Sequence, residues 1–365
     1  MNHPSRNVYN FNAGPSALPT AVLEKAQQEL TNFNQSGMSV MELSHRSKTY
    51  ETVHNEAIDR LKKLYDIPND YEVIFVQGGA SLQFSMIPMN FLTKDTKAGY
   101  VMTGSWSEKA FKETALFGTG YEIASSKDDA YRHIPTVSAK DVNEDDAYVH
   151  LTTNNTIYGT QWQVFPNFGN VPVIADMSSD IMSKPIDVSK FDMIYAGAQK
   201  NLGPSGVTVV IIKKSLLEKA NEQVPTILKY QTHVDSNSLY NTPPTFGIYM
   251  LGEVLKWIEM QGGLKAVQKV NEEKATYIYD VIDESNGFYI GHADKASRSL
   301  MNITFRLKDE TLEKQFLEEA AEKGFVGLNG HRSVGGCRAS TYNAVPTEAC
   351  LALSEFMKEF QAKHA

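Results

Sequence analysis

Short apolar runs separated by amphipathic stretches dominate the first 260 residues of the chain. The clearest run is Val73 to Val76. Further runs of this kind lie within residues 98–106, 146–156, 171–180, 191–197 and 206–212. Apolar residues at helical spacing predict helices over 20–33 and 49–64, and a third helix opens at Ala80 after a Gly-Gly turn. Buried strands spaced by helices predict an α/β fold with a mostly parallel sheet covered on both faces.

The pattern changes beyond about residue 264. Apolar residues at helical spacing predict helices over 264–283, 311–323 and 347–363. Residues 299–307 alternate between apolar and polar, as in a half-exposed strand. The first 20 or so residues are rich in Asn, Pro and Gly and are expected to form an extended arm. We therefore expect two domains, with the following bounds: a large domain over 16–263, and a smaller α+β domain over 1–15 and 264–365.

Composition narrows the class of protein. The chain has 365 residues and a net charge of −8, which argues against a nucleic-acid or anionic-membrane surface. Its two cysteines, Cys337 and Cys350, favour neither a disulfide framework nor a CxxC metal or redox site. No apolar run approaches the ~20 residues of a membrane span, and the first residues lack a signal-peptide core. We expect a soluble, cytoplasmic protein.

Two polar residues at strand ends suggest the chemistry. Asp176 ends the run "VIAD", and Lys200 follows "YAGAQ" among small residues. Taken singly, Asp176 reads as a helix N-cap and Lys200 as a surface charge. Taken together, at the carboxyl edge of a parallel sheet, they match what pyridoxal phosphate requires. The lysine would hold the aldehyde as an imine, and the carboxylate would keep the ring nitrogen protonated.

Two further segments fit the same cofactor. "QGGAS" (77–81) joins a strand to a helix, whose N-terminus could bind a phosphate; a plain tight turn explains it equally well. Trp106 could stack on a flat ring, although a core tryptophan is the commoner outcome. Neither a P-loop nor a Rossmann fingerprint occurs. These residues alone leave the alternatives open.

Several motifs, spread over nearly the whole chain, carry a specific resemblance. They are "FNAGPSALP" (11–19), "MELSHRS" (41–47), "QGGASLQF" (77–84), "GSWSEKA" (104–110), "NNTIYGTQW" (154–162), "ADMSSDIMSKPID" (175–187), "YAGAQKNLGPSG" (195–206), "YNTPPTF" (240–246) and "GLNGHRSVGGCRASTYNA" (327–344). In this order they resemble the fold-type I, class V pyridoxal-phosphate-dependent aminotransferases, and within them the phosphoserine aminotransferase family. That resemblance implies a seven-stranded, mostly parallel sheet in the large domain.

The resemblance also implies roles for individual residues. Lys200 would bind the cofactor covalently and shuttle the proton, with Asp176 on the ring nitrogen and Trp106 stacked on the ring. The remaining cofactor contacts would come from Ala80, Ser81, Thr156 and Gln199, and from Asn241 and Thr242 of the second subunit of a homodimer. No metal is implied.

The implied substrates are glutamate and 3-phosphohydroxypyruvate, both anionic at two ends. Arg338 would bind the α-carboxylate. The distal phosphate or γ-carboxylate would be bound by His45, Arg46, His331 and Arg332. Ser81 departs from the family, because many members carry arginine there. We expect the remaining arginines and histidines to suffice.

Two rival functions remain at this stage. The first is a cysteine desulfurase or another small-substrate aminotransferase of the same fold, for which Cys337 is the single cysteine near the expected site. The second is a cofactor-binding regulator or structural protein without catalysis. Family resemblance also implies a second activity, on 4-phosphohydroxythreonine in pyridoxine biosynthesis, and the sequence does not rank the two substrates.

Overall fold

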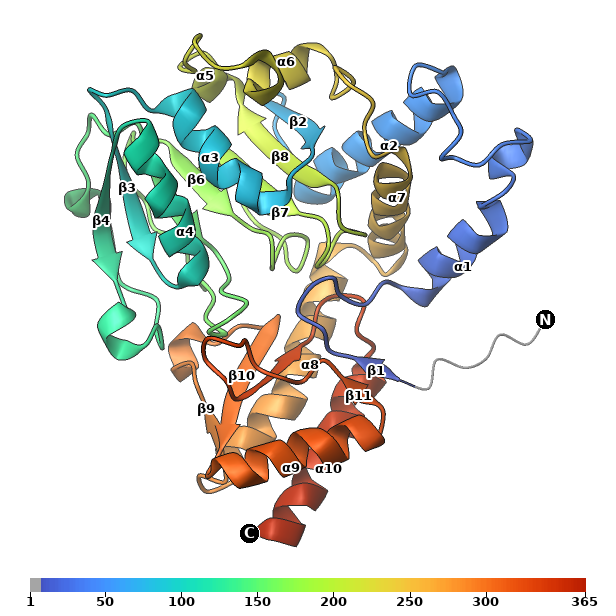
Figure 1. Ribbon diagram of the computed structural model, residues 1–365, viewed down its shortest axis with the longest axis vertical. Coiled ribbons are helices and arrows are strands. Elements are labelled where there is room, and N and C mark those ends of the chain that lie inside the picture. Colours follow the sequence, from blue (N-terminus) through green and yellow to red (C-terminus); the bar gives the residue numbers. More distant parts are fainter. Residues whose placement is uncertain (1–7) are drawn as a thin grey trace.

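The computed structural model describes residues 8–365 as a mixed α/β fold (Figure 1). Its strands are β1 (Tyr9–Asn10), β2 (Tyr71–Val76), β3 (Lys97–Met102), β4 (Thr119–Ser125), β5 (Tyr148–Thr152), β6 (Val173–Asp176), β7 (Met193–Gly197), β8 (Thr208–Lys213), β9 (Tyr289–Gly291), β10 (Asn302–Leu307), β11 (Phe325–Val326) and β12 (Cys337–Ser340). Its α-helices are α1 (Thr20–Glu29), α2 (Lys48–Tyr65), α3 (Gly79–Phe91), α4 (Ser105–Glu113), α5 (Lys214–Leu217), α6 (Tyr230–Asp235), α7 (Thr245–Met260), α8 (Leu264–Glu284), α9 (Glu310–Glu322) and α10 (Thr347–His364).

The central sheet has seven strands in the order β2-β8-β7-β6-β5-β3-β4. All of its neighbouring pairs are parallel except those of β8, which runs antiparallel to both β2 and β7. The mostly parallel, seven-stranded sheet predicted from the sequence is therefore confirmed. Its parallel strands bring the ends of β2, β3, β5, β6 and β7 to one edge.

Successive side chains along each strand point to opposite faces of the sheet and pack in two different cores. In β2, Val73 and Phe75 face a core shared with α1, α2 and α7, whereas Ile74 and Val76 face a core under α3 and α4. Figure 1 shows α3 and α4 across one face of the sheet. Because both faces are covered, the strands are apolar at nearly every position, as the sequence pattern predicted.

The C-terminal part of the chain forms a third core around a three-stranded sheet, β12-β10-β9, packed against α8, α9 and α10. The N-terminal arm joins this part: β1 pairs in parallel with β11, and the Phe11 side chain is buried in the third core. Residues 1–7 of the predicted arm lie outside the described residues. The domain bounds 16–263, and 1–15 with 264–365, stay a prediction.

Several elements differ from the sequence prediction. The helix predicted over 20–33 ends at Glu29, because the following segment is rich in Asn and Gln, and Asn34 takes a left-handed φ of 47°. Strand β4 was not predicted, because its side chains are exposed or half-buried at the sheet edge and form no apolar run. Within residues 8–365, no helix is both long and apolar enough to cross a membrane.

Lys274 is a fully buried lysine on α8. Its Nζ donates to the backbone carbonyls of Tyr342 at 2.8 Å and Val345 at 3.1 Å. The ammonium thus holds the segment that enters α10, and within residues 8–365 it does so without a carboxylate partner. Burial of the charge lowers the pKa of Lys274 from 10.5 to about 8.

This burial predicts a pH-dependent stability. Between pH 8 and 10.5 the unfolded chain binds more protons at Lys274 than the folded chain, so the free energy of unfolding rises with pH. The expected rise from this group is up to about 3 kcal/mol, at about 1.4 kcal/mol per pKa unit. Urea unfolding of the cofactor-free wild type and of Lys274→Met at both ends of this window measures it. Equal pH slopes in the two proteins would refute the prediction.

Candidate active site

A cavity of about 420 Å³ lies at the carboxyl edge of the central sheet. Strand ends, the N-terminus of α3, the arm and the segment around β12 all contribute to its wall. It is lined by Ala13, Gly14, Gly78, Gly79, Ala80, Ser81, Trp106, Thr152, Asn154, Thr156, Ile157, Asp176, Ser178, Ser179, Gln199, Lys200, His331 and Arg338. The structure therefore brings nine of the fourteen predicted site residues together.

Lys200 follows β7 and points into this cavity. Its Nζ donates to Thr156 Oγ1 at 2.8 Å and lies 5.8 Å from the centre of the Trp106 ring. The pKa of Lys200 is lowered to about 8, mainly by burial; the charge of Asp176 opposes the shift and that of Arg338 adds to it. A lysine with a lowered pKa is more often in the neutral form that attacks a carbonyl carbon.

Asp176 ends β6 and is buried beside Lys200 in the cavity wall. Its Oδ1 accepts the backbone N–H of Ser178 at 2.9 Å. Burial raises the pKa of Asp176, while hydrogen bonds from Ser178 and the charge of Lys200 oppose that rise. The carboxylate is thus held in one orientation by partners that favour its charged form.

The N-terminus of α3 forms the adjoining wall. Gly78 caps the helix with a φ of 86°, and a Cβ there would lie 2.6 Å from Leu82 Cβ. The turn therefore requires glycine for both its backbone angle and its packing. The first N–H groups of a helix have no intrahelical partner, and here Gly79, Ala80 and Ser81 line the cavity with those groups. Such a terminus suits a phosphate.

Positive groups also gather around the cavity. Arg338 Nη1 donates to the backbone carbonyl of Thr156 at 3.0 Å. His331 has a lowered pKa, caused first by burial and then by the charges of Arg338, Arg332 and Lys109. Within residues 8–365 no carboxylate pairs with Arg338. Cations that approach each other without an acidic partner indicate an anion-binding site.

Three buried polar atoms of the cavity have no hydrogen-bond partner among the described residues. They are Trp106 Nε1, Thr152 Oγ1 and Arg338 Nε. Buried polar atoms are nearly always paired, so unpaired ones at a cavity wall suit a polar ligand that completes them. The combination of this polarity with the Trp106 ring fits a flat ring that carries hydroxyl and phosphate groups.

Five predicted site residues do not line this cavity. His45 and Arg46 lie in the turn before α2, and the exposed Arg332 lies beyond His331. Asn241 lines a separate, smaller cavity beside Pro243, and Thr242 is exposed next to it. One chain alone therefore does not bring these five residues to the Lys200 cavity.

Sequence reasoning missed several residues in or beside the cavity, and three of them bear on its chemistry. Thr152 and Ser178 lie at or just after the ends of β5 and β6, and the same carboxyl-edge rule that identified Asp176 applies to both. Lys109 lies three residues after Trp106 on α4, with its Nζ 4.4 Å from the centre of that ring. Helical spacing from Trp106 was the signal that could have identified it.

Cys337, the candidate nucleophile of a desulfurase, is buried in the third core. Burial raises the pKa of its thiol well above the ordinary value. Reactive cysteines are partly exposed and have lowered pKa values, so Cys337 is a packing residue.

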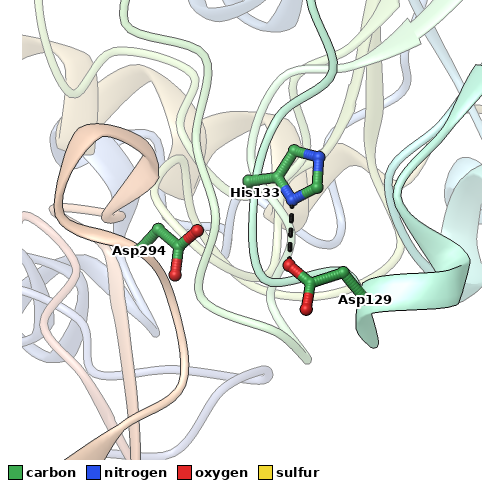
Figure 2. A group of neighbouring side chains, drawn as sticks. All are labelled: Asp129, His133 and Asp294. Carbon is green, nitrogen blue, oxygen red and sulfur yellow. Dashed lines mark hydrogen bonds and ion pairs between the residues drawn. The ribbon is translucent and has the colours of Figure 1, made fainter.

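A separate group of side chains lies outside the cavity. Figure 2 shows Asp129 and His133 facing Asp294, with His133 Nδ1 3.1 Å from Asp129 Oδ2. One ligand atom of each lies within 4.8 Å of the others, a spacing that a metal ion could bridge. However, Arg132 Nη2 lies 3.3 Å from Asp294 Oδ1 and already supplies positive charge there. The group links the segment after β4 to the segment after β9 through ion pairs.

The family model for class-V aminotransferases matches residues 8–353 of the chain. The chain is 71% identical over 360 residues to the phosphoserine aminotransferase of Lysinibacillus sphaericus strain C3-41, covering 99% of both chains.

Solved structures agree with this match. A phosphoserine aminotransferase studied for radiation damage of its Schiff base is 64% identical, with a TM-score of 0.95 over 98% of this chain and 99% of that one. The phosphoserine aminotransferase of Trichomonas vaginalis, solved with bound pyridoxal phosphate, is 41% identical, with a TM-score of 0.90 over 96% and 99% of the two chains.

Proposed function

The chain belongs to the class-V aminotransferase family, and from this membership we propose that it acts as a phosphoserine aminotransferase. The enzyme transfers the amino group between L-glutamate and 3-phosphohydroxypyruvate, giving O-phospho-L-serine and 2-oxoglutarate. One observation carries the proposal: Lys200 and Asp176 line the same cavity as an unpaired group of cations that includes Arg338. A lysine and carboxylate pair suits the cofactor, and the cations suit a substrate with two anionic ends.

Pyridoxal phosphate is the cofactor of this enzyme class, and the cavity fits it. When bound, it supplies an aldehyde carbon for imine formation and a ring that accepts electrons from a substrate carbanion. Trp106 would stack on the ring, while the N-terminus of α3, at Ala80 and Ser81, would hold the phosphate together with Gln199. The unpartnered Thr152 hydroxyl faces the same space and would donate to a ring substituent.

The protein's own side chains would stabilise the charge on the ring and transfer the proton. Asp176 would hold a proton on the ring nitrogen, because an ionised carboxylate stabilises a positive charge there. Lys200 Nζ would accept the proton released from the α-carbon of the substrate, and its hydrogen bond from Nζ to Thr156 Oγ1 orients it. Burial of both groups excludes water from the proton transfer.

Arg338 would bind the α-carboxylate of either substrate through its planar fork. His331 and Arg332 would bind the distal group, a phosphate in one substrate and a carboxylate in the other. The proposal that one cavity accepts both substrates is supported by the positive field of Arg338, Arg332 and Lys109 around His331. An arriving anion would favour the protonated form of His331.

Lys109 would contribute a positive charge that Ser81 does not provide. We expect Lys109→Met to lower kcat/KM for phosphohydroxypyruvate by about 2- to 5-fold, the scale of an exposed ion pair. The effect should fall on KM and should be absent with unphosphorylated hydroxypyruvate. Lys112→Met, three residues further along α4, is the matched control. Equal losses with both substrates would show that Lys109 does not bind the phosphate.

We propose a homodimer in which Asn241 and Thr242 complete the phosphate site of the other subunit. This proposal is supported by the distance of both residues from their own chain's cavity and by the exposure of their segment. His45 and Arg46 lie outside that cavity as well. We therefore propose that they bind the distal anion across the same subunit boundary.

We propose three finer aspects of the function, each from a separate observation. A cytoplasmic location agrees with the two free, buried thiols of Cys337 and Cys350. The division into a domain over 16–263 and one over 1–15 and 264–365 agrees with the pairing of β1 and β11. A second activity on 4-phosphohydroxythreonine would place the enzyme in pyridoxine biosynthesis as well, because that substrate shares the phosphate and the amino acid end.

Comparison of two acceptors tests the proposed function. With glutamate as donor, kcat/KM for phosphohydroxypyruvate should exceed that for hydroxypyruvate by at least about 10²-fold, because two charge-assisted hydrogen bonds to the phosphate are lost. Titration of the cofactor-loaded protein with glutamate alone should change its visible absorbance and release 2-oxoglutarate. Equal rates on the two acceptors would overturn the phosphate specificity. An unchanged absorbance would leave only a non-catalytic role.

A further inference from the structure

Three buried asparagine side chains bind three consecutive backbone carbonyls in the turn that follows β6. The bonds run from Asn201 Nδ2 to the carbonyl of Ile181 at 3.1 Å, from Asn343 Nδ2 to that of Met182 at 2.8 Å and from Asn271 Nδ2 to that of Ser183 at 3.1 Å. The asparagines come from the loop after β7, the segment after β12 and helix α8. This set of three, called here the asparagine joint, therefore ties three distant parts of the chain to one turn.

Two further hydrogen bonds link the members of the asparagine joint to one another. Asn201 Oδ1 accepts the backbone N–H of Asn343 at 3.0 Å, and Asn343 Oδ1 accepts from Asn271 Nδ2 at 2.9 Å. Lys274, three residues further along α8, binds two backbone carbonyls of the same segment after β12. That segment is thus held from the central sheet on one side and from α8 on the other.

The chemistry of the backbone groups sets the orientation of all three amides. A backbone carbonyl only accepts a hydrogen bond, and a backbone N–H only donates one. Asn201 must therefore turn Oδ1 toward Asn343 and Nδ2 toward the carbonyl of Ile181. Asn343 must turn Nδ2 toward the carbonyl of Met182, which leaves its Oδ1 to accept from Asn271. An aspartate at any of the three positions would place a carboxylate oxygen against a carbonyl oxygen.

The turn that the joint binds has an uncommon backbone conformation. Met182 has a φ of 57°, in the left-handed region that residues with a Cβ rarely adopt. Its N–H donates to the hydroxyl of Tyr65 at 2.6 Å, and its carbonyl accepts from Asn343. Such a conformation persists only where the surrounding contacts over-determine it. The turn is therefore a rigid anchor for the segments that bind to it.

The joint lies behind the two residues whose separation matters for the proposed reaction. Asn201 directly follows Lys200, and Asn343 follows Arg338 by five residues. At their tips, Lys200 Nζ donates to Thr156 Oγ1 at 2.8 Å and Arg338 Nη1 donates to the carbonyl of Thr156 at 3.0 Å. The three asparagines do not line the Lys200 cavity, so they hold the backbone that carries these two side chains.

From this geometry we propose that the three asparagines of the joint are positioning residues that fix Arg338 relative to Lys200. They set the distance between the site of the α-carboxylate and the amine that accepts the α-proton. The inference rests on the proposed function, because it requires Arg338 and Lys200 in those two roles. A displacement of about 1 Å at such a distance can lower a rate by about 10²-fold.

Kinetics of Asn343→Ala test the proposal, because this variant removes both side-chain bonds of Asn343. We expect kcat with glutamate to fall by about 10- to 100-fold while KM stays nearly unchanged, since the groups that bind the anions remain. With glutamate deuterated at the α-carbon, the isotope effect on this half-reaction should rise above that of the wild type. An unchanged kcat and isotope effect, with only the melting temperature lowered, would overturn the proposal.

The control is a buried asparagine outside the joint. Asn90 is 0% exposed and its Nδ2 donates to the carbonyls of Met86 and Leu228, so Asn90→Ala should lower stability but leave kcat and the isotope effect unchanged. A kcat loss in Asn90→Ala equal to that in Asn343→Ala would contradict the positioning role.

Two further variants probe the bonds within the joint. Asn343→Asp keeps the size of the side chain but loses the donor to Met182, so it should be no more active than Asn343→Ala. Asn271→Ala combined with Asn343→Ala should lower kcat by less than the product of the single losses, because these side chains share a bond. Full activity in Asn343→Asp, or additive losses in the double variant, would contradict the joint.

Hydrogen exchange in the unmodified, cofactor-free protein decides the inference even if the variants do not fold. The amide of Asn343 lies outside the strands and helices but donates to buried Asn201 Oδ1, so it should exchange as slowly as the amides of β12. Fast exchange at this amide would overturn the proposal. If the wild type transferred no amino group, the proposed function would fail. If the wild type were active and Asn343→Ala kept its full kcat, the inference alone would fail.

Discussion

Replacing Lys200 with alanine is expected to lower the transamination rate by at least about 10⁴-fold, the upper scale of a removed general acid–base group. The variant loses both the amine proposed to bind the cofactor and the group proposed to carry the proton. The Nζ of Lys200 donates to Thr156 Oγ1, and within residues 8–365 Lys200 is the only lysine that lines the cavity. Single-turnover rates with glutamate, together with the visible absorbance of the loaded protein, measure the loss.

The control for this variant is Lys184→Ala. Lys184 Nζ lies 3.4 Å from the carbonyl of Trp162, outside the cavity, and should be replaceable with little effect on turnover. A small primary amine added to Lys200→Ala should restore part of the proton transfer, since the cavity of about 420 Å³ admits it. Substantial turnover in Lys200→Ala without added amine would refute the assignment of Lys200.

Replacing Asp176 with asparagine is the second large effect. Asparagine keeps the size of the side chain and accepts a hydrogen bond, but it carries no charge to hold the proton on the ring nitrogen. We expect the rate to fall by about 10²- to 10³-fold, as when one preorganised electrostatic group is removed from an active site. The loss should appear in kcat for both substrates. Pre-steady-state kinetics of each half-reaction measures it.

Asp180→Asn is the matched control for this prediction. Asp180 is also a buried carboxylate, and it accepts hydrogen bonds from Thr153 and Gln161 rather than lining the cavity. Its replacement should affect stability without a comparable loss of kcat. If Asp180→Asn and Asp176→Asn reduced kcat equally, the special role of Asp176 would be wrong.

Sequence reasoning predicted the site where local pattern and topology coincide. Asp176 and Lys200 follow apolar runs, and the carboxyl ends of such runs meet at one sheet edge, so their proximity could be argued before the structure. The position of Arg338 could not be argued in this way. It lies in β12, which has only four residues and forms no long apolar run, so family resemblance alone assigned Arg338 to the site.

The contact between His150 and Tyr195 could not be predicted from the sequence, because it depends on the order and register of the strands in the sheet. His150 and Tyr195 look like ordinary interior residues of two strands, 45 positions apart. Their contact arises because β5 and β7 both flank β6, with Asp176 paired to Tyr195 and Ile174 to His150. Pattern predicts that these strands are buried, but the order of strands in the sheet decides which side chains meet.

The reversed direction of β8 has a consequence for how firmly Lys200 is anchored. A parallel β8 would have required a connection of a dozen or more residues back to the opposite edge of the sheet. Instead, ten residues, 198–207, turn the chain straight back, and β7 and β8 are bonded to each other on either side of the turn. Lys200 thus lies in a short loop, called here the tether, that is held by paired strands at both ends. Insertions into this tether should be tolerated far less well than insertions into the twenty-residue connection between β5 and β6.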